Sequence, residues 1–207
     1  MKIKILILML LLFIIYYNYN VNSTCLIPLY YYPQLQLLNT NLILKELINI
    51  INSDKWIIYD DFHNKQIFHN NNIKSITDIL LKNQSTLNST NEPTWRLFPL
   101  LYNKQVFNNH DILCPNTIKM LLKIPYVINA GFSCLEAGKI TDYHTDNNKK
   151  YYRYQLPLII PKGNCKFKLV NKILDWSYPF IFNDNCYHQV WNLTTQNRFV
   201  LILDILR

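Results

Sequence analysis

The chain has 207 residues, of which 50% are hydrophobic and 16% charged, with only 3 glycines and a formal net charge of +8. A chain of this length and apolar content can bury enough surface to fold as one domain, so intrinsic disorder and collagen-like or glycine-rich linker architectures are excluded. The lysines occur together with an excess of Ile, Asn and Tyr, as in an AT-rich coding sequence, so we attribute the charge to codon bias and expect no nucleic-acid partner.

The N-terminus, residues 1–23, has the layout of a membrane-targeting segment. Two lysines in Met1–Lys4 precede the uncharged apolar run Ile5–Tyr17, as in a signal peptide. The run is short for a membrane span, but no Ala-x-Ala-like cleavage site follows it, so an uncleaved signal anchor is the alternative. Both readings predict that the remaining chain enters the endoplasmic reticulum, where it stays at the membrane, stays in the lumen or is secreted.

A luminal location has consequences for asparagine and cysteine. Four Asn-x-Ser/Thr sequons would be available for glycosylation in that compartment: Asn22, Asn83, Asn88 and Asn192. Five cysteines cannot all pair within one chain, and no Cys-x-x-Cys spacing indicates zinc. A disulfide is therefore possible, but its connectivity cannot be read from the sequence.

Residues 24–94 are predicted to be a helical and loop lead-in. Asn39–Ser53 carries apolar residues at largely helical spacing, behind Asn and Thr residues that can cap the first turn. A second short helix is predicted at Ser75–Lys82, which begins with the spacing of a capping box. The segments Phe62–Asn72 and Lys82–Asn91 are rich in polar residues and are predicted to be loops.

Residues 95–207 are predicted to form a β-rich domain. Pro115 can occupy the first turn of a helix that runs to Lys123 and is ended by Pro125. Short apolar or alternating runs follow, each bounded by turn residues: Tyr126–Leu135, Tyr152–Ile160, Cys165–Val170, Pro179–Phe182, Tyr187–Trp191 and Phe199–Leu206. Many short strands at this spacing predict a sandwich or barrel, so the expected fold class is mainly β with N-terminal helices.

Two histidines among these strands have chemically suggestive neighbours. His144 and Asp146 are two residues apart and lie on the same face of an extended segment, and His188 follows on another predicted strand. Two histidines and one carboxylate form the facial triad of non-haem Fe(II) oxygenases, in which the metal keeps open positions. From spacing alone, a structural pair of histidines explains the same residues equally well.

Each of these histidines is followed by an arginine. Arg153 comes nine residues after the first, and Arg198 comes ten residues after the second, at the head of a strongly apolar strand. A buried guanidinium needs an anionic partner, because an unpaired buried charge is costly. A bidentate contact to a dicarboxylate would satisfy Arg198, and a salt bridge to Asp184 or Asp204 would do so equally well.

The second half of the chain, about residues 95–204, resembles the aspartyl/asparaginyl β-hydroxylase family. Phe182–Trp191 is similar to the family's Phe-Asp-Asp-Ser-x-x-His-Glu-Val-Trp signature, and Arg198–Asp204 is similar to the Arg and apolar strand that close the family's domain. Three further segments are similar to family segments: Trp95–Phe98, Phe132–Gly138, and Ile160–Cys165 with Trp176 after it.

This resemblance implies an Fe(II)- and 2-oxoglutarate-dependent dioxygenase with a double-stranded β-helix (jelly roll) core. It implies that His144 and His188 bind the iron, and that Asp146 is either a third ligand or a neighbour of the ligands, since some members carry Gly there. Five residues would bind or line the pocket of 2-oxoglutarate: Arg153, Arg198, Ser133, Gln155 and Trp95. Gln155 departs from the family, which usually has His there, and an amide can donate a hydrogen bond to a carboxylate but carries no charge.

The resemblance also suggests a substrate. Dioxygen would be used to hydroxylate the β-carbon of Asp or Asn residues in a protein, and a luminal location fits EGF-like domains as targets. The N-terminal segment would provide the contact with the membrane. Two alternatives remain: a lipid or small-molecule hydroxylase of the same fold, and a β-sandwich binding module that has lost catalysis, for which Gln155 gives a reason.

Overall fold

The structure is a computed structural model that describes residues 25–59, 80, 84–146 and 150–207. The predicted targeting segment, the sequons at Asn22 and Asn83, and all of the predicted helix at Ser75–Lys82 except Leu80 lie outside these residues. Across the described ranges, no helix has both the length and the apolar character needed to span a membrane.

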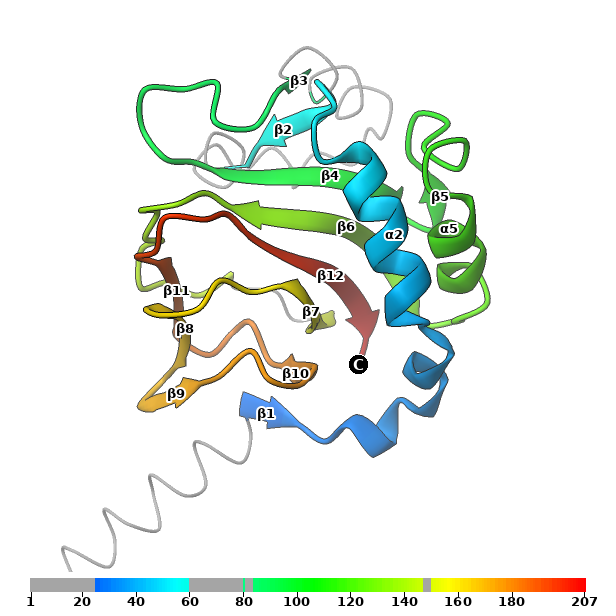
Figure 1. Cartoon of the computed structure of the whole chain (residues 1–207). Helices are drawn as coiled ribbons and strands as arrows, with labels where there is room; N and C mark the ends of the chain where they lie inside the picture. The colour runs from blue at the N-terminus through cyan, green and yellow to red at the C-terminus, as the bar shows by residue number, and fades with distance from the viewer. Residues whose placement is uncertain (1–24, 60–79, 81–83, 147–149) are drawn as a thin grey trace, which may run out of the picture.

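Strands make up most of the ordered elements, which confirms the predicted fold class. Their bounds are β1 Leu26–Ile27, β2 Trp56–Ile58, β3 Gln84–Ser85, β4 Trp95–Tyr102, β5 Gln105–Val106, β6 Val127–Leu135, β7 Tyr151–Ile159, β8 Cys165–Leu169, β9 Lys172–Leu174, β10 Phe180–Phe182, β11 His188–Asn192 and β12 Arg198–Leu206. The large sheet has the order β1-β10-β7-β12-β6-β4-β2-β3, with β5 paired to β4, and the small sheet has the order β11-β8-β9 (Figure 1). All pairings in both sheets are antiparallel.

In the described part of the chain, two α-helices pack against the large sheet (Figure 1). Helix α2, Thr40–Ile50, starts where predicted, because the side chain of Asn39 accepts hydrogen bonds from two backbone N–H groups of the first turn. Helix α5, Pro115–Leu121, begins at the predicted proline. Two 3₁₀ helices, Leu29–Tyr31 and Pro33–Leu37, lead from β1 to α2.

Alternation along the strands separates two apolar clusters. In β12, Phe199, Leu201 and Leu203 belong to the cluster between the large sheet and the helices, whereas Val200 belongs to the cluster between the two sheets. Arg198 has the same parity as Val200 and therefore faces the space between the sheets. The two facing sheets form the double-stranded β-helix, and this interior is where the predicted site residues lie.

The N-terminal part of the described chain contributes to the same sheet. Strands β1, β2 and β3 come from the predicted lead-in, so the large sheet contains residues from both sides of the expected boundary at residue 95. A disulfide joins Cys25, next to β1, to Cys186, just before β11, with a Cα–Cα distance of 5.9 Å. This is the connectivity that the sequence could not supply.

The sequon at Asn192 is not accessible in the fold. Asn192 is fully buried in β11, and its Nδ2 donates to the carbonyl oxygens of Leu135 at 3.0 Å and Gln196 at 2.8 Å. The expectation that this residue is available for glycosylation is therefore wrong for the folded chain, because the nitrogen that would carry the glycan lies in the interior. Asn88, in contrast, is exposed.

Candidate metal centre and anion site

Three potential metal ligands meet where β11 begins. His144 and His188 lie opposite each other in an isolated antiparallel bridge, with ring centroids 4.4 Å apart. Oδ1 of Asp146 lies 3.4 Å from Nε2 of His144. One ligand atom from each of the three residues lies within 4.8 Å of the others, an arrangement that could hold a metal ion.

The backbone orients both imidazole rings. Nδ1 of His144 donates to the carbonyl oxygen of Asp142 at 2.7 Å, and Nδ1 of His188 donates to that of Cys186 at 2.9 Å. Because a carbonyl oxygen can only accept, the proton sits on Nδ1 and leaves Nε2 of each ring as the ligand atom. Burial lowers the pKa of His188 to about 4, so this imidazole is neutral, as metal binding requires.

Arg153, on β7, lies among three carboxylates. Its Nη1 donates to Oδ2 of Asp146 at 2.7 Å, its Nε donates to Oδ1 of Asp204 at 3.1 Å, and its Nη2 is 3.7 Å from Oδ2 of Asp184. Burial acts to lower the pKa of Arg153, but the three carboxylates outweigh it and raise the pKa. Burial likewise acts to raise the pKa of Asp146, and Arg153 with the two histidines holds it far below its usual range.

Arg198 is in the opposite situation. It is 2% exposed, and its Nε and Nη1 have no hydrogen-bond partner among the residues that the structure describes. Its guanidinium lies over the ring of Trp176, with 4.8 Å from Cζ to the ring centroid. Burial lowers the pKa of Arg198 to about 10. The salt bridges that the sequence allowed for this arginine are made by Arg153 instead.

Gln155 lies between these two arginines along the interior of the large sheet. On β7 and β12, Arg153 is opposite Asp204, Gln155 is opposite Ile202, and Arg198 is at the other end of β12. Gln155 is 4% exposed, and within the described ranges its Oε1 has no hydrogen-bond partner. Polar side chains thus point into the interior from both strands: Arg153 and Gln155 from β7, and Arg198 from β12.

Ser133 and Trp95 form a pair on the adjoining strands. Nε1 of Trp95, on β4, donates to Oγ of the buried Ser133, on β6, at 2.8 Å. Ser133 is opposite Val200 of β12, so it faces the same interior as Arg198. The structure therefore places all eight sequence-predicted site residues on the interior side of the two sheets, at two ends: the His–Asp–His group with Arg153, and Arg198 with its neighbours.

Comparison with known proteins identifies the family. The sequence model of the family described as Aspartyl/Asparaginyl beta-hydroxylase matches residues 39–207, which is most of the chain. The chain belongs to this family. Family membership agrees with the resemblance read from Phe182–Trp191 and covers more of the chain, since it includes α2.

Two curated relatives of this family each match a little under half of the chain. An ornithine lipid ester-linked acyl 2-hydroxylase from Rhizobium tropici is 35% identical over 98 residues, covering 45% of this chain and 35% of that protein. The human aspartyl/asparaginyl beta-hydroxylase is 29% identical over 98 residues, covering 44% of this chain and 13% of that protein. The chain thus matches about a third or less of the length of these relatives.

Solved structures give weaker likenesses. An oxidoreductase of the 2OG-Fe(II) oxygenase family from Burkholderia pseudomallei has a TM-score of 0.40 and 8% identity, covering 54% of this chain and 68% of that one. A predicted oxalate decarboxylase from Thermotoga maritima has a TM-score of 0.37 and 12% identity, covering 55% and 82%. At these scores neither likeness bears on activity.

Two aromatic residues that were not among the predicted site residues also contact this site. Trp176 stacks on Arg198, and its Nε1 has no hydrogen-bond partner from the described part of the chain. The ring of Tyr59 packs on Trp95, with centroids 4.5 Å apart, and burial raises the pKa of Tyr59 while Arg153 acts to lower it. Trp176 belonged to a segment that resembled the family, but its contact with Arg198 depends on the packing of the two sheets.

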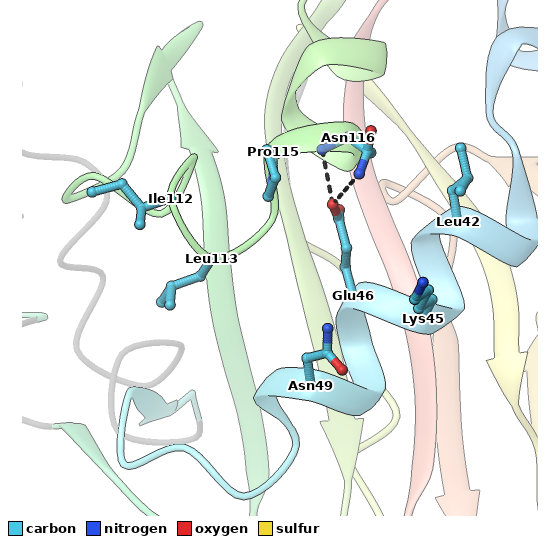
Figure 2. A pocket seen from close by; sticks show the side chains of 8 residues that line it. All are labelled: Leu42, Lys45, Glu46, Asn49, Ile112, Leu113, Pro115 and Asn116. Atoms are coloured by element: carbon cyan, nitrogen blue, oxygen red, sulfur yellow. Dashed lines mark hydrogen bonds between the residues drawn. The ribbon is translucent and has the colours of Figure 1, made fainter.

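A groove of about 320 Å³ lies away from this site, between α2 and the start of α5 (Figure 2). Glu46 in this groove accepts hydrogen bonds from the backbone N–H and Nδ2 of Asn116, both at 2.8 Å, and from the N–H and hydroxyl of Thr117. Burial acts to raise the pKa of Glu46, but these hydrogen bonds outweigh it and lower the pKa. Glu46 therefore caps α5, a structural role.

Proposed function

We propose that this chain is an Fe(II)- and 2-oxoglutarate-dependent dioxygenase in which His144, Asp146 and His188 hold the metal. The observation that carries the proposal is that one interior contains both a His–Asp–His group and Arg198, a buried guanidinium with unpartnered donors in the described chain. A dicarboxylate that reaches from the metal to Arg198 would satisfy both ends. Membership of the hydroxylase family supports the same conclusion.

The residues of the chain would divide the work between them. Bound Fe(II) would supply the reaction of dioxygen with an unactivated carbon–hydrogen bond. The backbone carbonyls behind His144 and His188 keep Nε2 of both rings available to the metal. Arg198 would pair with the distal carboxylate of 2-oxoglutarate, and Phe167 and Phe182, both fully buried beside His188, keep water out.

For the substrate we propose Asp or Asn residues of a protein, hydroxylated at the β-carbon, with EGF-like domains as the target class. The human relative's name supports this assignment. A lipid acyl chain is the second candidate, supported by the name of the Rhizobium tropici relative. The luminal location and the membrane contact through residues 1–23 remain part of the proposal, and the Cys25–Cys186 disulfide supports an oxidising compartment.

The test is 2-oxoglutarate turnover by the full chain with Fe(II) and ascorbate. We expect succinate formation, loss of activity in His188→Ala, and a rise of at least about tenfold in the 2-oxoglutarate requirement in Arg198→Ala, since removing one partner of a buried charge pair costs several kcal/mol. Mass spectrometry of an EGF-like peptide and of ornithine-lipid vesicles then shows which substrate gains an oxygen atom. Binding of 2-oxoglutarate without succinate formation would favour the non-catalytic binding module. If the chain neither binds 2-oxoglutarate nor forms succinate, the proposal is refuted.

A further inference from the structure

The two arginines of this site differ in what they can still bind. Arg198 has two unpartnered donors among the described residues, whereas all three nitrogens of Arg153 face carboxylates, at 2.7, 3.1 and 3.7 Å. Two of these carboxylates, on Asp146 and Asp204, are within hydrogen-bond distance. Arg153 keeps N–H groups on Nη2 that make no hydrogen bond to these carboxylates, but a further carboxylate bound there would lie beside the negative charge of all three.

We infer that Arg153 is a positioning residue that orients the carboxylate of Asp146 toward the metal. Arg153 itself does not anchor 2-oxoglutarate. Arg153 binds Oδ2 of Asp146, while Oδ1 of the same carboxylate lies 3.4 Å from Nε2 of His144, on the side of the metal group. The inference rests on the proposed function, because it assigns a role relative to the metal.

The position of Arg153 is itself fixed by the large sheet. Asn129 on β6, Asp204 on β12 and Arg153 on β7 are directly opposite one another across three neighbouring strands. Nδ2 of Asn129 donates to Oδ2 of Asp204 at 2.9 Å, and Oδ1 of Asp204 accepts from Nε of Arg153. This row of side chains connects Asp146, which lies outside the regular strands, to the central strands β12 and β6 of the large sheet.

A carboxylate ligand needs such support. The backbone N–H of Asp146 donates to the carbonyl oxygen of Asp184 at 3.0 Å, but a backbone bond does not by itself set the direction of the carboxylate. A planar guanidinium that holds one oxygen fixes the direction of the other, which an ammonium group cannot do equally well. Groups that orient metal ligands typically change metal affinity by 10–100-fold when they are removed.

The test measures Co(II) affinity of the full, metal-free chain by visible absorption, which needs no turnover. Arg153→Lys and Asp146→Ala should each weaken Co(II) binding at least about tenfold. In the Asp146→Ala background, Arg153→Lys should add less than about twofold, because its only route to the metal has been removed. With Co(II) bound, calorimetry should show 2-oxoglutarate affinity changed less than about threefold by Arg153→Lys and at least about tenfold by Arg198→Lys.

Arg96→Lys is the matched control. Arg96 is more deeply buried than Arg153, with 0% against 11% of its side chain exposed, and it pairs with Glu136 at 2.6 Å, but the pair lies outside the His–Asp–His group. This variant should keep the Co(II) affinity of the wild type, which separates the role of Arg153 from the general cost of placing Lys at a buried arginine. Should Arg153→Lys fail to fold, Asp204→Asn removes the charge that anchors Arg153 and should weaken Co(II) binding several-fold.

Two results would overturn the inference alone. One is unchanged Co(II) affinity in both Arg153→Lys and Asp204→Asn, and the other is a loss of 2-oxoglutarate affinity in Arg153→Lys as large as that in Arg198→Lys. A wild-type chain that binds no Co(II) would instead refute the proposed function, and the inference would fail with it. The two failures are therefore distinguishable.

Discussion

Asp184 provides a quantitative test of the electrostatics around the site. The residue is fully buried, and within the described chain neither carboxylate oxygen has a hydrogen-bond partner. Burial raises its pKa from an ordinary 3.8 to about 6, and Arg153, 3.7 Å away, offsets only part of this effect. We predict that Asp184→Asn stabilises the protein at neutral pH, because the amide has nearly the same shape and cannot ionise.

The magnitude follows from the two pKa values. Each pH unit between them is worth about 1.4 kcal/mol, so ionised Asp184 costs the folded state about 3 kcal/mol above pH 6. Since the folded pKa is the higher one, wild-type stability falls as the pH rises from about 3.8 to about 6, and the cost is fully present above that range and absent below it. For a chain of this size, about 3 kcal/mol corresponds to a Tm higher by roughly 6–12 °C.

The assay is thermal unfolding of the metal-free full chain at pH 7.5 and pH 4. Asp184→Asn should unfold at a higher temperature than the wild type at pH 7.5, and the gap should shrink to roughly 1–2 °C at pH 4. Asp175→Asn is the control, because Asp175 forms an exposed pair with Lys166, and it should not reproduce this pH dependence. An Asp184→Asn variant no more stable than the wild type at pH 7.5 would show that the contact with Arg153 outweighs burial.

Three further predictions concern the frame and the metal group. Replacing Cys25 and Cys186 together by Ser removes a link between residues 161 positions apart, so the free energy of unfolding in denaturant should fall by roughly 2–5 kcal/mol, and an unchanged midpoint would contradict this. Gly131→Ala places a Cβ 3.0 Å from the carbonyl oxygen of Phe98, so the free energy of unfolding, measured by thermal unfolding, should fall by about 1–3 kcal/mol. A variant as stable as the wild type would show that strands β4 and β6 can move apart to make room. Burial acts to lower the pKa of His144, but the interactions with Asp146 and with the carbonyl oxygen of Asp142 together outweigh it and raise the pKa. Co(II) affinity should therefore fall as the pH drops below that raised value, and equal affinity at pH 8 and pH 5.5 would refute the assignment of His144 as a ligand.

Local features of the sequence were sufficient to predict most elements. The cap at Asn39, the proline at the start of α5 and the apolar alternation of β12 depend on residues close together in the chain, and the structure confirms each element within a few residues. The same holds for the His-x-Asp spacing, because a period of two places His144 and Asp146 on one side of an extended segment. His188 lies on a distant predicted strand, and the family resemblance implied that it binds the metal together with His144.

The sequence by itself thus determined the fold class, the family and the three candidate metal ligands. It could not decide which arginine is paired, because the carboxylates around Arg153 come from three separate segments that only the folded sheets bring together. It could not give the partner of Cys25 or the burial of Asn192, which depend on contacts across the whole chain. Tertiary structure decided these points because the energy of a charge or a polar group depends on what surrounds it in space, and its sequence neighbours do not specify that.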